Sequence, residues 1–101
     1  MRTFNWTPQT CGVLREKLKS YVEVVNQYDG YIIKAGVWQA PDRYEKYVLP
    51  KLNAVLAYVV SLGFTKEEAE ICFPTFYEQI SVKSIYERYA RNLSEIIWRE
   101  K

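Results

Sequence analysis

The stretch LNAVLAYVVSL, residues 52–62, decides the fold. It contains no charged residue and only two clearly polar ones, Asn53 and Ser61. Its apolar residues recur at the three- and four-residue spacing of an α-helix. A helix that is apolar nearly all round is typical of a buried core element. The sequence therefore predicts a helix over about 51–62 at the centre of the fold.

The residues before this stretch extend the helical pattern across a proline. Pro41 and Asp42 are typical of a helix start, and apolar residues follow at helical spacing as far as Pro50. Proline lacks a backbone donor, and its ring crowds the preceding turn. The helix therefore either kinks at Pro50 or restarts with Pro50 in its first turn, and the sequence leaves both outcomes open.

The residues after this stretch predict a stop and a new start. Gly63 is suited to a helix C-terminus. Thr65 and Glu68 have the spacing of a capping box, in which the hydroxyl and the carboxylate each accept a backbone N–H. We therefore expect a helix to begin at Lys66.

This helix is expected to end before Pro74, because proline cannot continue the pattern. Thr75 and Glu78 repeat the capping-box spacing, which predicts a further helix from Phe76.

Both ends of the chain carry amphipathic helices. Thr7 and Pro8 are a suitable N-cap and first helical residue for the N-terminal one. Its apolar stripe contains Leu14, Leu18, Tyr21, Val22, Val25 and Tyr28, and the pair Asp29 and Gly30 is expected to end it. The apolar face of the C-terminal helix contains Val82, Ile85, Tyr86, Tyr89, Leu93, Ile96 and Ile97.

These elements predict an all-α fold, a compact bundle of four to five helices around the central apolar helix of about 51–62. The 101 residues match the common size of one domain, so we expect a single helical domain over 1–101. Segment 31–38, YIIKAGVW, is too short for periodicity to distinguish helix, strand and loop. An aromatic content of 16% argues against disorder.

Charge and targeting signals indicate an ordinary intracellular environment. The net charge is +2, from 14 basic and 12 acidic residues that are mixed along the chain. No apolar run approaches the roughly 20 residues of a membrane span, and the first residues do not resemble a secretory signal. Cys11 and Cys72 are too few for a disulfide framework, so we interpret them as packing thiols. We expect a cytoplasmic protein without membrane contact.

The sequence does not contain the residues of common catalytic sites, so we do not expect an enzyme. Histidine is absent, and the four glycines stand apart rather than forming a phosphate-binding loop. Glu67, Glu68 and Glu70 are interpreted as complements of a helix dipole rather than as metal ligands. We expect no metal and no cofactor.

Aromatic residues are the most informative excess, with nine tyrosines and three tryptophans. So many rings are not all expected to fit in a small core, and such rings are enriched at protein interfaces. Tyr31, Trp38 and Tyr77, at or near connections, are therefore the candidate interface residues. We interpret five tyrosines on apolar helical faces as half-buried rim residues of the core: Tyr21, Tyr44, Tyr47, Tyr86 and Tyr89.

The sequence therefore predicts a small non-catalytic binding or regulatory protein. It would act as an adaptor or inhibitor by occupying the surface of another protein, and a homodimer is a further expectation. The alternative is a DNA-binding regulator that uses its C-terminal helices in a helix-turn-helix-like arrangement, with Lys83, Arg88 and Arg91 outward. We do not expect nucleic acid to be the partner, because the basic residues do not cluster. An enzyme that works through carboxylates and tyrosines is a third hypothesis.

Overall fold

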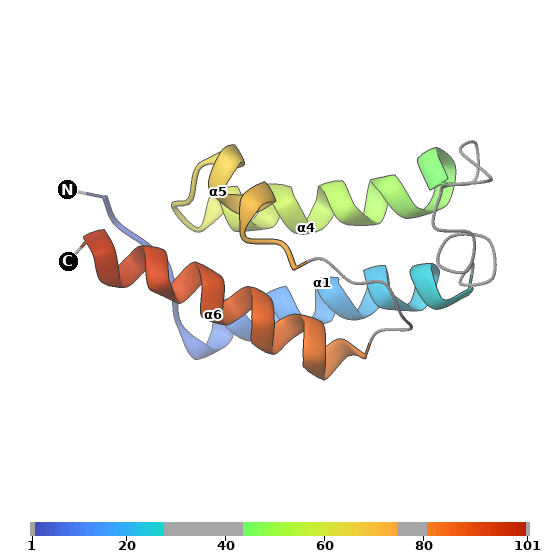
Figure 1. The fold of residues 1–101 in the computed structure, drawn as a ribbon, viewed down its shortest axis with the longest axis horizontal. Helices are drawn as coiled ribbons and strands as arrows, with labels where there is room; N and C mark the ends of the chain where they lie inside the picture. The colour runs from blue at the N-terminus through green and yellow to red at the C-terminus, as the bar shows by residue number, and fades with distance from the viewer. Residues whose placement is uncertain (1, 28–43, 75–80, 101) are drawn as a thin grey trace.

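The computed structural model describes residues 2–27, 44–74 and 81–100. Its elements are the helices α1 (Pro8–Gln27), α4 (Leu49–Ser61), α5 (Lys66–Ile71) and α6 (Val82–Glu100), with a π-helical turn, η1 (Tyr44–Val48), before α4. Figure 1 shows α4 and α6 on two sides of α1, with α5 near one end of the molecule. The described residues contain no strand, and the predicted all-α fold is confirmed.

Local sequence chemistry explains how α1 begins. The Thr7 hydroxyl accepts a hydrogen bond from the backbone N–H of Thr10 at 3.1 Å, and Pro8 is the first helical residue. The predicted apolar stripe is buried as far as the structure describes it: Leu14, Leu18, Tyr21, Val22 and Val25. The expected end at Asp29 and Gly30 lies outside the described residues.

The α-helix α4 begins at Leu49 with Pro50 in its first turn, which is one of the two alternatives predicted. Pro50 lies in the first turn of α4, where its missing N–H leaves no helical hydrogen bond unmade. The π-helical turn η1 leads directly into α4. Val48, at the junction, is fully buried and joins the core.

The helix at the centre is α1, which corrects the prediction for residues 52–62. α1 packs against both α4 and α6 and has five buried residues, whereas Val55 and Val59 are the buried residues of α4. Leu56 is only partly buried. The reason is that the exposed side of α4 includes alanines such as Ala54 and Ala57, which water tolerates although they contribute to an apolar pattern.

The predicted capping box at the start of α5 is confirmed. The Thr65 hydroxyl accepts from the Glu68 N–H at 3.1 Å, and a Glu68 carboxylate oxygen accepts from the Thr65 N–H at 2.9 Å. α5 begins at Lys66, the predicted residue.

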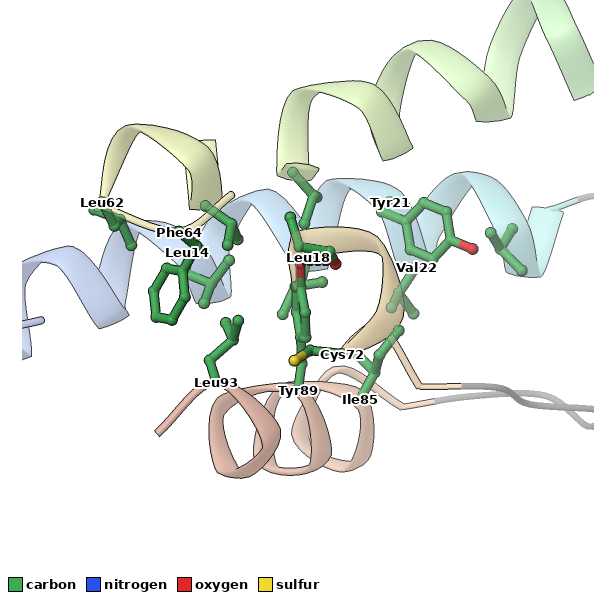
Figure 2. Packing of buried hydrophobic residues seen from close by; sticks show 14 of the residues in the cluster. Leu14, Leu18, Tyr21, Val22, Leu62, Phe64, Cys72, Ile85, Tyr89 and Leu93 are labelled. Carbon is green, nitrogen blue, oxygen red and sulfur yellow. Dashed lines mark hydrogen bonds between the residues drawn. The ribbon is translucent and has the colours of Figure 1, made fainter. Parts of the chain in front are cut away.

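α6 places its predicted apolar face on the core. Ile85, Tyr89 and Leu93 are buried, and the remaining predicted residues of that face, Val82, Tyr86, Ile96 and Ile97, are partly buried against them. Figure 2 shows Tyr89 and Leu93 of α6 facing the side chains of α1, with Cys72 beside Tyr89. The buried residues form one cluster across α1, α4, α5 and α6.

Residues 2–6 form an extended segment that we call the N-terminal strap. Its Asn5 N–H donates to the carbonyl oxygen of Leu62 at 2.8 Å. The ring of Phe4 lies 4.8 Å from the ring of Phe64 between centroids, and the Trp6 ring meets Phe64 edge-on at 6.0 Å. The strap thus covers the turn between α4 and α5.

Three further predictions concern residues that the structure does not describe. These are the conformation of segment 31–38, the helix expected from Phe76 and the side chain of Tyr44. Of the other rim tyrosines, Tyr21 and Tyr89 are buried more deeply than predicted, and Tyr86 is partly buried as predicted. Tyr47 is 42% exposed, which agrees with its interpretation as a half-buried rim residue.

None of the helices within the described ranges is long and apolar enough to cross a membrane.

Candidate protein-binding surface

The predicted interface residues Tyr31, Trp38 and Tyr77 all lie outside the described residues. Their place on the molecular surface therefore stays a prediction.

Two large apolar side chains stand out by their exposure. Ile71 at the end of α5 is 82% exposed, and Trp98 in the last turn of α6 is 75% exposed. Val13, Tyr47 and Val60 are exposed to only 40–44%. Each of them is a candidate anchor for a partner protein, Ile71 on α5 and Trp98 on α6.

Helix phase explains why both side chains point outward. Ile71 follows the buried Ala69 by two positions, which turns it about 200° around the helix axis. Trp98 follows the buried Tyr89 by nine positions, which places it about 180° away. Each side chain therefore lies opposite the residue that anchors its helix in the core.

Hydrogen bonds join α5, and Cys72 directly after it, to α6. The Tyr89 hydroxyl donates to the Ala69 carbonyl oxygen at 2.7 Å, and the Asn92 side-chain amide donates to the Cys72 carbonyl oxygen at 2.8 Å. Burial raises the pKa of Tyr89 above its usual range, so the phenol keeps the proton that it donates. The edge of the Phe73 ring meets Tyr89 at 5.1 Å, which adds an aromatic contact. Two hydrogen bonds and one aromatic contact thus link α6 to α5 and the residues after it.

Charges of both signs surround the two apolar side chains. Glu67 and Glu70 are exposed on α5, and Arg91, Glu95 and Arg99 are exposed on α6. An apolar centre within a polar, charged rim is the usual composition of a protein interface.

Glu68, the remaining acidic residue of α5, is engaged in the fold. Its carboxylate accepts hydrogen bonds from Arg2 and from the Thr65 N–H, which together hold its pKa at about 2. The sequence did not predict that Arg2 pairs with Glu68, because the two residues are 66 positions apart in the chain.

The two cysteines are free thiols in the structure. Cys72 is buried, and burial together with the Glu68 carboxylate raises its pKa. Cys11 is only partly buried and contacts Tyr86, whose pKa is raised mainly by burial and also by its hydrogen bond to this thiol. In the described part of the chain, no three His, Cys, Asp or Glu residues are placed to hold a metal ion.

The basic residues of the DNA-binding alternative are all exposed on α6. Lys83, Arg88 and Arg91 share the outer side of this helix with Glu87 and Glu95, which break up the positive charge. Residues 72–81 separate α5 from α6, whereas a helix-turn-helix motif uses a turn of three or four residues. The geometry therefore does not favour this alternative.

The outer face of α4 is a second, weaker candidate. Its exposed residues include Asn53, Ala54, Ala57 and Val60, and the single charge of the helix is Lys51. Most surface helices carry several charges on this side. The side chains are small, however, and the most apolar of them, Val60, is only 40% exposed.

Comparisons with protein-family models, with characterised proteins and with solved structures found no match to this chain.

Proposed function

We propose that this protein is a non-catalytic binding protein that occupies the surface of another protein, with Ile71 and Trp98 as the anchors of its interface. The observation that carries the proposal is the exposure of these two large apolar side chains, 82% and 75%. Each would bury considerable apolar area on contact with a partner.

The residue types and their setting support this assignment. Tryptophan is among the residues that most often dominate binding energy at interfaces, and arginine is another. Arg99 is the neighbour of Trp98, and Arg91 lies two helical turns before it.

Affinity capture from the native host, followed by mass spectrometry, tests the proposal. The tagged wild type is compared with Ile71→Ser and Trp98→Ser. Both variants are expected to lose the captured partner, by at least about tenfold in recovered amount, if these residues act as hot spots. Their free energies of unfolding should stay within about 0.5 kcal/mol of the wild type, because exposed substitutions rarely change stability by more.

Val60→Ser on α4 is the matched control. It also replaces an exposed apolar residue by serine, but on another face of the molecule. Capture by this variant should equal that of the wild type. Equal capture by all four proteins would refute the proposed interface, and a selective loss in Val60→Ser would move the interface to the outer face of α4.

Salt dependence separates this proposal from the DNA-binding alternative. Binding to phosphate weakens steeply as salt rises, whereas binding through apolar anchors responds much less. Tight duplex binding that falls steeply with salt, and that is lost on replacing Lys83, Arg88 and Arg91 by glutamine, would favour the DNA-binding alternative.

A further inference from the structure

The N-terminal strap is held by several hydrogen-bond acceptors that converge on the guanidinium group of Arg2. Arg2 donates from Nη1 to Glu68 Oε2 at 2.9 Å and from Nη2 to Glu68 Oε1, a bidentate pair. It also donates to the carbonyl oxygen of Gly63 at 2.9 Å and to Glu100 Oε1 at 3.2 Å. Two carboxylates and a carbonyl that converge on one planar cation form a specific arginine site.

The strap binds in the manner of an extended peptide ligand. Arg2, Phe4 and Trp6 are partly buried, whereas Thr3 and Asn5 between them are exposed. This alternation is that of an extended chain that inserts every second side chain into a surface. The Asn5 N–H adds a backbone hydrogen bond to the body of the protein.

The body of the protein is shaped to receive this backbone. Gly63 has φ of 118°, a conformation that favours glycine, and a Cβ at this position would collide with the carbonyl oxygen of Thr3. We call the receiving residues the strap seat: Leu62, Gly63, Phe64, Glu68 and Glu100.

We propose that the strap seat is a peptide-binding site for the pattern Arg-x-Phe-x-Trp, and that the strap of a second copy of this chain can occupy it by reciprocal exchange. Leu62 and Phe64 are only 3% exposed with the strap in place, and the rings of Phe4 and Trp6 pack on Phe64, so a strap that left would uncover apolar surface that an equivalent segment could cover again. The equivalent segment is the same sequence on another copy.

Exchange would preserve the contacts of the strap with its seat, whereas the hydrogen bond from Thr10 Oγ1 to the carbonyl oxygen of Asn5, next to the hinge, would have to form again between the two chains. The strap ends where α1 begins, at Pro8, so only residues before the helix have to move. Each exchanged strap makes in the partner's seat the contacts that it makes here in its own, which is why exchange of identical elements is a low-cost route to dimers. In a single chain the strap has a high effective concentration at its own seat, so we expect dimers of the wild type only at high protein concentration.

Two complementary full-length variants test the exchange. The first, Glu68→Gln with Glu100→Gln, keeps its strap but has a defective seat, and glutamine still fits the capping box. The second, Arg2→Gln with Phe4→Ala, has an intact seat but a defective strap. Each variant alone should sediment as a monomer, whereas their equimolar mixture should form a 1:1 complex. A mixture that sediments as two monomers would overturn the proposal.

A peptide assay keeps the proposal testable if the strap-defective variant unfolds on its own. The probe is a synthetic peptide with the sequence of residues 1–7, and its control carries glutamine in place of arginine. The arginine peptide should bind the strap-defective variant at least about tenfold more tightly than the control and should raise its melting temperature, because charged hydrogen bonds are lost in the control. Equal effects of both peptides would overturn the peptide site. Stabilisation by the peptide with no complex in the mixture would overturn exchange between copies.

Discussion

Replacing Tyr89 by phenylalanine removes one oxygen atom from the centre of the structure. Tyr89 is fully buried, and its hydroxyl donates to the carbonyl oxygen of Ala69 at 2.7 Å. Ala69 is itself fully buried near the end of the short helix α5. Phenylalanine keeps the ring and its edge contact with Phe73, so the change leaves no sizeable cavity. The effect therefore reports on this hydrogen bond between α5 and α6.

The expected loss is about 1 to 3 kcal/mol in the free energy of unfolding. A typical hydrogen bond contributes about 0.5 to 1.5 kcal/mol net, but a buried acceptor that loses its donor costs more, because it is desolvated without a partner. Water cannot easily replace the phenol, since both residues are 0% exposed. In a chain of about this size, each kcal/mol lowers the melting temperature by about 4 to 8 °C.

Urea unfolding followed by circular dichroism measures this loss, with Tyr86→Phe as the control. Tyr86 lies one turn earlier on α6, is only partly buried and lies near the Cys11 thiol, which is at most a weak hydrogen-bond partner. We expect the control to lose less than about 1 kcal/mol, with the same dependence on urea. Equal losses in the two variants, or a loss below about 0.5 kcal/mol for Tyr89→Phe, would refute the role given to the bond to Ala69.

Three further predictions follow from burial and charge. Leu18→Ala, at a fully buried position of α1, should lower the free energy of unfolding by about 2 to 5 kcal/mol. Leu56→Ala, at a partly buried position of α4, should lower it clearly less. Urea titrations compare the two variants, and equal losses would show that α4 is as central to the core as α1. The pKa of Glu68 is lowered from 4.5 to about 2 in the folded protein, so its pairing stabilises the fold above about pH 4.5, and this contribution is lost as the pH falls toward 2. Acid unfolding of Glu68→Gln should therefore be less steep than that of the wild type, and superimposable profiles would count against the pairing. In native protein, Cys72 should react with N-ethylmaleimide far more slowly than the more exposed Cys11, because burial both shields the Cys72 thiol and raises its pKa. Mass spectrometry over time compares the modification rates of the two cysteines. Similar rates would contradict the burial of Cys72.

Elements that depend on neighbouring residues were predicted well from the sequence. The start of α1 at Pro8, the restart with Pro50 in the first turn as one of two alternatives, and the capping box of Thr65 and Glu68 all agree with the structure. Each depends on hydrogen bonds or backbone angles within four residues, which the local sequence specifies.

Features that depend on the whole fold were predicted less well. The apolar pattern of residues 52–62 suggested a central helix, because the pattern does not distinguish a buried alanine from an exposed one such as Ala57. The contact of Arg2 with Glu68 joins residues that are 66 positions apart, so no local sequence pattern predicts it. The exposure of Trp98, in contrast, could have been inferred from its phase on α6, since it lies opposite Tyr89.

The contacts of Arg2 also have a consequence for the order of folding. Its hydrogen bonds to Glu68 and Glu100 join residues that are 66 and 98 positions apart in the chain. Closing so long a loop costs entropy that is not recovered until the helices between have formed and packed. The strap should therefore dock after the rate-limiting step, and Arg2→Gln should speed unfolding while leaving the folding rate nearly unchanged.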